Sequence, residues 1–123
     1  MLAMTLLVDV DVPGDPVPAP RPRVGQGRVY MPKRYVAALD DLRTRLLVDL
    51  RRRKQRPRYR GPVRVDVTFR VLRAGDVDNY CKTVLDALNE VVIEDDKQVL
   101  DLHGKLVPAE GGTGLHVRVE TLG

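Results

Sequence analysis

The stretch that most clearly decides the fold is Val63-Arg-Val-Asp-Val-Thr-Phe-Arg-Val71, in which apolar and polar residues alternate without a break. Successive side chains of a β-strand point to opposite faces, so this alternation predicts a strand with one buried face and one wet face. Arg73-Ala-Gly75 then ends the strand. Residues 2–12 alternate in a similar way, with Leu2, Met4, Leu6, Val8, Val10 and Val12 on one side. They predict a second half-buried strand.

Two other segments have helical spacing of their apolar residues. The first covers about residues 35–54, with the stripe Val36, Leu39, Leu42, Leu46, Leu47 and Leu50. The second covers about residues 79–91, with the stripe Cys81, Val84, Leu85, Leu88, Val91 and Val92. Residues 99–107 and 115–121 predict two more strands, which we expect to form a hairpin around Gly111-Gly-Thr-Gly114.

This order of elements predicts an α+β fold. We expect a single small domain over residues 1–123, with a mixed or antiparallel sheet of about four strands and two main helices. Between the first strand and the first helix, residues 13–33 are too rich in proline and glycine to be regular. So long a loop in a small domain suggests a function. This one carries Arg21, Arg23, Arg28 and Tyr30.

The net charge of +4 hides an uneven distribution. Residues 13–73 hold 17 of the 21 Lys and Arg residues against five acidic residues, whereas residues 74–101 hold eight acidic residues against Lys82 and Lys97. A basic block beside a compact acidic one suits a protein that binds a polyanion with one region and a metal with the other. The simpler interpretation is that the basic residues form a solvated helix face.

The composition excludes several other classes. No apolar run approaches the roughly 20 residues that span a bilayer, and Met1-Leu-Ala-Met-Thr-Leu-Leu lacks the features of a signal peptide. The single cysteine, Cys81, cannot form an internal disulfide or a zinc site, so we expect a reducing, cytoplasmic setting.

Two acidic segments flank the second predicted helix: Asp76-Val-Asp78-Asn79-Tyr-Cys-Lys82 and Glu94-Asp95-Asp96. If a strand beginning at Gln98-Val99 pairs with residues 63–71, the second segment can fold back beside the first. Carboxylates gathered in this way need a cation, and a hard divalent metal is the usual one. One or two Mg²⁺ ions could activate water and stabilise the leaving oxygen of a phosphodiester. Lys82 could contact the scissile phosphate.

Each of these residues also has a structural interpretation. Asp78 or Asn79 could cap the helix, Asp78 and Lys82 could form an exposed pair, and residues 94–97 could be a polar turn. Asp86 could be a partner of Lys82 or a surface acid. His103 and His116 fit surface positions better than metal ligands, and Cys81 fits the core better than a nucleophilic role.

In three segments the chain resembles the RusA family of Holliday junction resolvases. Pro18-Ala-Pro20-Arg21-Pro22-Arg23 with Gly27-Arg28-Val-Tyr30-Met-Pro32 is similar to the family's basic N-terminal loop. Asp76-x-Asp78-Asn79-x-x-Lys82-x-x-x-Asp86-Ala-Leu88 is similar to its central signature, and Asp95-Asp96-Lys-Gln98-Val99 to its second acidic motif. Two departures stand out: Glu90 replaces a frequent glycine, and Ala74-Gly75 precede Asp76 where more polar residues are common.

The resemblance implies a structure-selective endodeoxyribonuclease of DNA recombination and repair, located at the nucleoid. Such an enzyme is a homodimer that resolves four-way DNA junctions by paired symmetric nicks, using Mg²⁺ or Mn²⁺ and no small-molecule cofactor. Carried over by position, Asp76, Asp78 and Asp96 would hold the metal and Lys82 would be catalytic, with Asp95 a neighbouring candidate ligand. The nucleic-acid-binding candidates are Arg21, Arg23, Arg28, Lys33 and Arg73.

Two other functions stay open from the residues alone. The chain could be a basic DNA-binding module for branched DNA whose acidic segments are structural, or a metal-dependent nuclease for flaps or RNA. A single Phe, four Tyr and no Trp leave little material for base stacking, so we do not expect a platform for single strands.

Overall fold

The strand at residues 63–71 is the second strand of a four-stranded sheet, counted from one edge. In the computed structural model the order is β1-β6-β4-β5, formed by β1 (Leu6–Pro13), β6 (Gly114–Thr121), β4 (Val63–Val71) and β5 (Val99–Pro108). β6 pairs antiparallel with both β1 and β4, whereas β5 runs parallel to β4. The structure describes residues 4–20, 23–25 and 28–123, with residues 23–25 and 28–30 described by their backbone.

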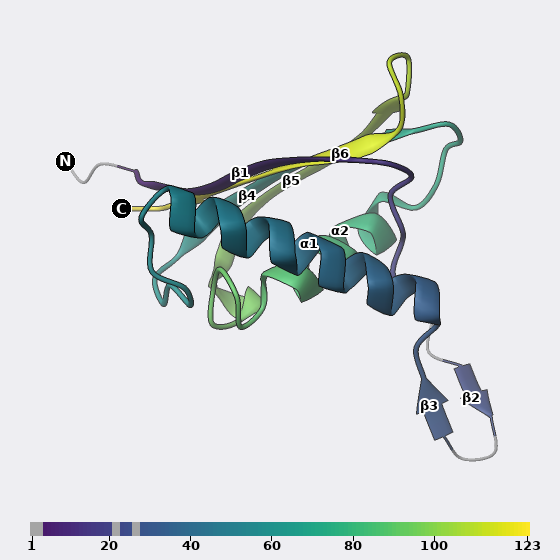
Figure 1. Cartoon of the computed structure of the whole chain (residues 1–123), viewed down its shortest axis with the longest axis horizontal. Coiled ribbons are helices and arrows are strands. Elements are labelled where there is room, and N and C mark those ends of the chain that lie inside the picture. The colour runs from purple at the N-terminus through teal and green to yellow at the C-terminus, as the bar shows by residue number, and fades with distance from the viewer. Residues whose placement is uncertain (1–3, 21–22, 26–27) are drawn as a thin grey trace.

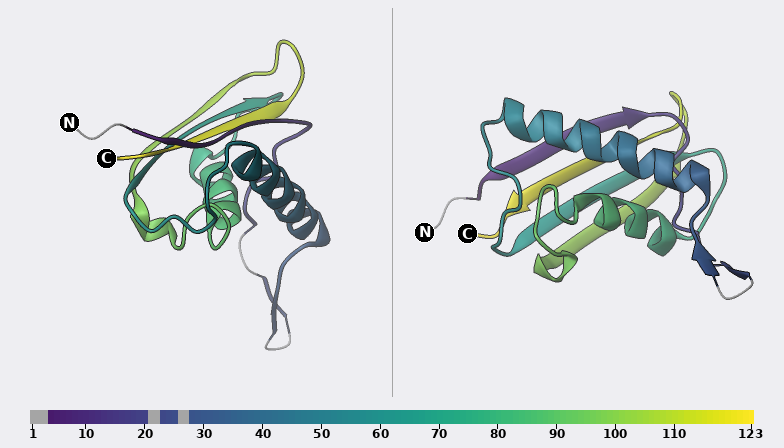
Figure 2. Two further views of the ribbon diagram at one scale, coloured as in Figure 1. Left: turned by 60° about the vertical axis from the view of Figure 1, so that its left-hand side comes forward. Right: turned by 60° about the horizontal axis from the view of Figure 1, so that its bottom comes forward.

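Both helices cover the same face of the sheet, as Figures 1 and 2 show. They are α1 (Lys33–Arg52) and α2 (Val77–Leu88), and the short 3₁₀ helix η1 (Asp96–Gln98) follows α2. The predicted α+β class with a mixed four-stranded sheet and two helices is therefore confirmed. Within the described residues, no helix combines the length and the apolar character needed to cross a membrane.

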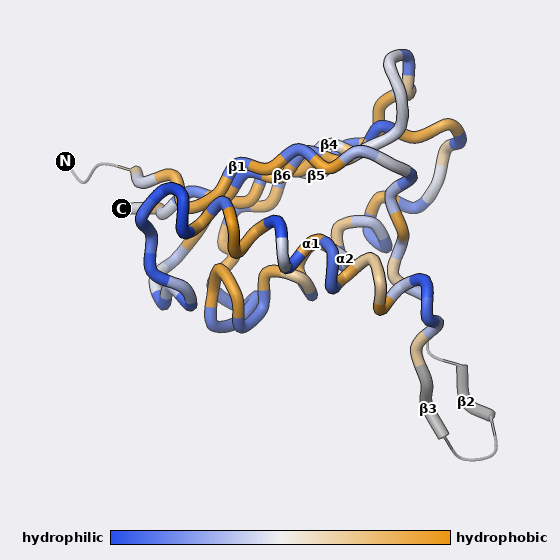
Figure 3. The backbone as a smooth tube through the Cα atoms, viewed as in Figure 1, coloured by the Kyte–Doolittle hydropathy of each residue, from blue (hydrophilic) through white to orange (hydrophobic). Residues whose placement is uncertain are grey.

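The core lies between the sheet and the two helices. Every second residue of β4 from Val63 to Phe69 is buried, and α1 and α2 close the layer with leucines, Val84 and Ala87. The alternation appears in Figure 3 as a change between apolar and polar colour along the strands. Burying such side chains contributes roughly 1.5–3 kcal/mol each for Val, Leu or Phe. The largest fully buried side chains are Phe69, Leu46, Leu50, Leu88 and Ile93.

Three details of the predicted fold were wrong. β5 and β6 are not a hairpin, because β4 lies between them in the sheet. Residues 13–33 are not wholly irregular, since β2 (Arg23–Gly25) and β3 (Arg28–Tyr30) form a small hairpin that extends away from the sheet (Figure 1). β1 begins only at Leu6, and a register shift between Leu6 and Val8 leaves Leu7 and Val8 both buried while Met4 is exposed.

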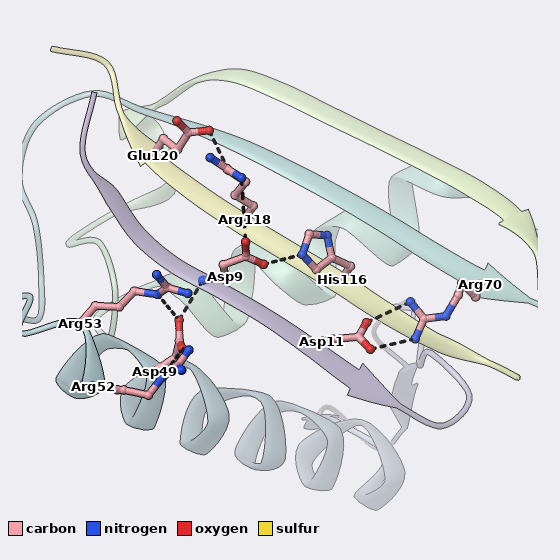
Figure 4. A network of polar contacts seen from close by, with 9 residues as sticks. All are labelled: Asp9, Asp11, Asp49, Arg52, Arg53, Arg70, His116, Arg118 and Glu120. Atoms are coloured by element: carbon pink, nitrogen blue, oxygen red, sulfur yellow. Dashed lines mark hydrogen bonds and ion pairs between the residues drawn. The ribbon is translucent and has the colours of Figure 1, made fainter. Parts of the chain in front are cut away.

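The face of the sheet opposite the helices carries a network of ion pairs between charged side chains. Asp9 contacts His116 and Arg118, and Arg70 contacts Asp11 across β6 (Figure 4). Further along, Arg64 contacts Asp66 and Asp101, Arg118 contacts Glu120, and His103 contacts Asp101. His103 and His116 therefore occupy surface positions, as expected, and each has an acidic partner that the sequence did not predict.

One buried carboxylate joins α1 to β1. Asp49 is only 6% exposed and accepts hydrogen bonds from the backbone N–H of Asp9 at 2.8 Å, from Arg53 Nε at 2.8 Å and from Arg52 Nη2 at 2.6 Å (Figure 4). Burial by itself would raise the pKa of Asp49, but the Asp9 N–H and the two guanidinium groups lower it below the usual 3.8. The carboxylate also satisfies an outward N–H of the sheet edge.

We expect Asp49→Ala to lower the free energy of unfolding at pH 7 by about 2 kcal/mol, because the variant leaves the Asp9 N–H without its partner. A lowered folded-state pKa stabilises the protein fully above the unfolded-state value of 3.8, and this contribution is lost as the pH falls through the folded-state pKa. Urea unfolding between pH 5 and 2 should therefore show a steeper acid loss in wild type than in the variant.

Asp41→Asn is the matched control, since Asp41 pairs with Arg45 on the same helix but is 56% exposed. Exposed pairs of this kind contribute about 0–1 kcal/mol. Equal effects of the two substitutions would contradict a special role for Asp49.

Candidate active site

The first acidic segment forms the start of α2. Asp76 is the N-cap, and its Oδ1 accepts a hydrogen bond from the backbone N–H of Asp78 at 3.1 Å. Asp76 and Asp78 are both exposed, and they lie at the helix end whose dipole favours negative charge. The capping interpretation was therefore wrong for Asp78 and Asn79, because the cap is Asp76. This arrangement leaves the second Asp76 oxygen and the Asp78 carboxylate facing solvent.

Lys82 lies one turn after Asp78 on the exposed side of α2. Asp78 and Lys82 form no ion pair with each other or with any other described residue, so the simple surface-pair interpretation is wrong. Instead both side chains line a groove of about 310 Å³ between α2 and β5, together with Val77, Cys81, Leu85, Leu102 and Gly104. A carboxylate and an ammonium group with no ion-pair partner in the described part of the chain therefore border the same groove.

The second acidic segment forms a capped turn before β5. The Asp95 side chain accepts a hydrogen bond from the Lys97 N–H, and the Gln98 side chain accepts one from the Asp95 N–H. The Lys97 N–H is the main reason why the pKa of Asp95 is lowered. Gln98 also donates to the Tyr59 and Gly61 carbonyls, which fixes the turn at the start of β4. Asp95 thus has the structural role of a cap, while Asp96 is exposed on η1.

The two acidic segments do not meet within one chain. Asp76 precedes α2 and Asp96 follows it, and a helix of twelve residues is about 18 Å long. Among the described residues, no three His, Cys, Asp or Glu side chains are close enough to hold a metal ion. The expected convergence of the two segments was therefore wrong for a single chain, although the strand at Val99 does pair with residues 63–71.

The basic loop is anchored beside the first acidic segment. The Ala19 N–H donates to the Asn79 carbonyl at 2.9 Å, and the Thr83 hydroxyl donates to the Val17 carbonyl at 2.7 Å. Thr83 and Ala19 are both buried. These contacts direct the chain toward the β2–β3 hairpin from the same helix that carries Asp78. Sequence reasoning missed Thr83, because a hydroxyl within an apolar stripe does not reveal its partner.

The predicted nucleic-acid-binding residues are only partly located. Arg21 lies outside the described residues, as do the side chains of Arg23 and Arg28. Lys33, at the first position of α1, and Arg73, after β4, are exposed. Arg73 lines a hollow with Arg34, Asp15 and Thr113, so Arg34 joins the cationic residues near the start of α2. The sequence did not distinguish Arg34 from the other arginines of α1.

Asp86 and Cys81, two polar residues of α2 considered as site candidates, have structural roles. Asp86 accepts a hydrogen bond from the Tyr35 hydroxyl at 2.6 Å, and its carbonyl accepts one from Arg43, so Asp86 joins α2 to α1 and is not a partner of Lys82. Burial, followed by the bond to Asp86, raises the pKa of Tyr35. Cys81 is buried beneath Gly104, and burial with the nearby Asp78 charge raises the pKa of its thiol.

The comparison with family models gives a match over most of the chain. The model described as Endodeoxyribonuclease RusA covers residues 13–120, which include the basic loop, both acidic segments, β4, β5 and all but the last residue of β6, but only the last residue of β1. The chain belongs to the RusA endodeoxyribonuclease family. No curated protein matches the chain.

The turn after α2 contains one of the departures from the RusA pattern, Glu90. Glu90 has a φ of +63°, and its N–H donates to the Ile93 carbonyl at 2.8 Å. This left-handed conformation favours glycine, which has no Cβ to clash with the neighbouring carbonyl. The chain therefore retains the turn that a glycine would favour, at the cost of backbone strain.

Replacing Glu90 by glycine should relieve this strain. We expect Glu90→Gly to raise the free energy of unfolding by up to about 1 kcal/mol, measured by urea denaturation. Glu110→Gly is the control, because Glu110 is an exposed turn residue without a positive φ. A loss of stability in Glu90→Gly similar to that in the control would refute the explanation.

Removing the Thr83 hydroxyl should loosen the anchor of the basic loop. In Thr83→Val the Val17 carbonyl loses its donor, so we expect a stability loss of about 1 kcal/mol. Amide exchange at Ala19 should become faster while exchange in β4 changes little. Thr83→Ser keeps the hydroxyl and should preserve slow exchange at Ala19. Equal exchange in all three proteins would show that Thr83 does not hold the loop.

Proposed function

We propose that this RusA-family chain is a metal-dependent endodeoxyribonuclease that resolves four-way DNA junctions by paired symmetric nicks in recombination and repair. The observation that carries the proposal is the start of α2, where Asp76, Asp78 and Lys82 are exposed within two turns. The basic loop is anchored on the same helix, through the carbonyl of Asn79 and the hydroxyl of Thr83. Family membership supports the nuclease class.

Asp76 and Asp78 suit Mg²⁺ by the chemistry of their donors. Mg²⁺ in proteins is commonly bound by one or two carboxylates together with substrate phosphates and water. Asp78 has both oxygens available, and Asp76 has one that is not used for capping. When bound there, Mg²⁺ or Mn²⁺ would supply an activated water and stabilisation of the leaving oxygen.

Stabilisation of the developing negative charge and binding of the DNA backbone would be carried out by side chains of the protein. Lys82 borders the groove beside Asp78 and has no acidic partner among the described residues, so its ammonium group can contact a phosphate oxygen that gains negative charge. Lys33, Arg34 and Arg73 can neutralise phosphates of the junction arms near the same helix end, with Arg21, Arg23 and Arg28 as further candidates. Binding through phosphates would be steeply salt-dependent and would place the protein on DNA at the nucleoid.

Asp95 and Asp96 can join the Asp76–Asp78 pair only from a second copy of the chain. In one chain the length of α2 separates them by about 18 Å, which far exceeds the reach of two carboxylates around one ion. We therefore propose a homodimer, as the two-fold symmetry of a four-way junction would also favour. Each site would then contain Asp76, Asp78 and Lys82 of one copy and Asp96 of the other.

The test is cleavage of a labelled four-way junction beside a linear duplex of the same sequence, with Mg²⁺ and with EDTA. Paired, ligatable nicks in the junction alone, abolished by EDTA, are expected. Equal cutting of the duplex, of flaps or of RNA would replace junction specificity with a broader nuclease activity. Tight junction binding without cutting in Mg²⁺ or Mn²⁺ would make the protein a DNA-binding module.

Asp78→Asn should abolish junction cleavage while junction affinity, measured by gel shift, is unchanged or higher. The substitution removes a metal ligand and also a negative charge that repels DNA. Lys82→Ala should lower the cleavage rate by about 100-fold, in line with the loss of one donor to a developing charge.

Asp41→Asn is the control for these variants, because it removes an equal charge from an exposed position on α1 outside the proposed site. It should cut the junction at the wild-type rate. A fully active Asp78→Asn variant would refute the assignment of the site.

A further inference from the structure

The end of α1 and the chain that follows it form the most basic segment of the protein. Residues 51–60 contain seven Lys and Arg residues and no acidic residue. The cations of this segment that contact a carboxylate of the protein are Arg52, Arg53 and Arg58. The other four are exposed and have no acidic partner among the described residues: Arg51, Lys54, Arg56 and Arg60.

The stability of α1 explains only part of this charge. Cations in the last turn of a helix interact favourably with its dipole, which accounts for Arg51. Arg56 and Arg60 lie beyond the end of α1, where this effect is lost. Lys54, the second residue after α1, has a φ of +58°, a conformation that favours glycine. The unpaired cations are therefore not explained by helix stability.

The basic segment is held in place by the turn after α2. The Arg58 N–H donates to the Val91 carbonyl at 3.0 Å, and the Tyr59 N–H donates to the Val92 carbonyl at 2.9 Å. The Glu94 N–H donates in return to the Tyr59 carbonyl at 3.2 Å. Preorganised groups lose less conformational freedom when they bind a ligand. The unpaired cations are thus presented on an ordered part of the surface.

This segment lies at the end of α1 that is remote from the β2–β3 hairpin (Figure 1). A helix of twenty residues is about 30 Å long, which separates residues 51–60 from Lys33 and Arg34 at its start. Between these ends, the exposed surface of α1 carries Asp40 and Asp41, and only Asp41 has a basic partner in the described chain. Negative charge there disfavours a phosphate backbone laid along the helix. The two basic regions are therefore separate.

We propose that residues 51–60 are a second DNA-binding surface, which contacts phosphates of a different junction arm from the arm beside Asp76. The proposal rests on the proposed function and identifies a source of its junction selectivity. The arms of a four-way junction leave one point in different directions, so a junction can occupy both basic regions without crossing Asp40. A linear duplex occupies one region at a time. Joint occupation raises the affinity, because the second contact forms within the same complex.

The salt dependence of binding tests the surface without any cleavage. Arg56→Gln/Arg60→Gln and Arg51→Gln/Lys54→Gln each remove two proposed phosphate contacts. Junction affinity is measured in EDTA at several salt concentrations by fluorescence anisotropy. The slope of log affinity against log salt should become less steep by about 1.8 in each double variant, because each lost phosphate contact contributes about 0.9. The affinity itself should fall by about tenfold or more.

Two controls separate local contacts from net charge and from folding. Arg45→Gln/Arg118→Gln removes an equal charge from other surfaces and should keep the wild-type slope. Arg56→Lys/Arg60→Lys retains the charge and should also keep this slope. Both double Gln variants should unfold at the wild-type urea midpoint, because the substituted side chains are exposed and have no ion-pair partner in the described chain.

A linear duplex with the sequence of two junction arms tests the assignment to a separate arm. Wild type should bind the junction more tightly than the duplex. The two double Gln variants should lose most of this preference, because only the junction occupies both basic regions together. Equal losses of affinity for duplex and junction would overturn the assignment to a separate arm.

An unchanged salt slope in both double Gln variants would overturn the surface, and so would an equal change in the Arg45→Gln/Arg118→Gln control. Loss of polyglutamate binding with an unchanged DNA slope would indicate an acidic protein partner and would also overturn it. Cleavage in Mg²⁺ is measured separately. Junction cutting with an unchanged slope would refute the surface and keep the nuclease assignment. A reduced slope in a protein that cuts no junction would refute the nuclease assignment and keep the surface.

Discussion

Parallel pairing of β4 with β5 is the constraint on which the rest of the structure depends. Two parallel neighbours need a connection that returns along the whole strand, and α2 provides it. The residues before the helix therefore lie at the end of β4, and those after it lie at the start of β4. This crossover separates Asp76 and Asp78 from Asp95 and Asp96, and it leaves β5 at the edge of the sheet.

The two faces of the sheet stabilise the protein in different ways. The helix-covered face buries the apolar side chains, while the open face neutralises its charges in pairs such as Arg64 with Asp66 and Arg70 with Asp11. Asp78 and Lys82 have no such partners among the described residues. Asp78 and Lys82 thus lie unpaired beside a groove, although most of the charged side chains on the open face of the sheet are paired. A role in binding a ligand explains this arrangement better than a role in stabilising the fold.

Capping and binding overlap in this site. Asp76 caps α2 and Asp95 caps η1, each through an N–H two residues further along the chain. A cap fixes the rotamer of its carboxylate and still leaves one oxygen available, so a capping residue can also be a preorganised ligand. Thr83 and Asn79 add to this by attaching the basic loop to the helix that begins with the acidic pair.

The sequence by itself determined the elements and the local chemistry. Alternation at 63–71 and helical spacing around Leu46 and Val84 depend on neighbours in the chain, so the strand, the helices and the α+β class followed directly. The core position of Cys81 was also predicted in this way, and the acidic segments and Lys82 were identified as candidate site residues. Only the tertiary structure decided which strands are neighbours, because pairing depends on contacts between distant segments. The tertiary structure places β6 between β1 and β4 and pairs Asp86 with the Tyr35 hydroxyl. It also shows that the length of α2 separates the two acidic segments.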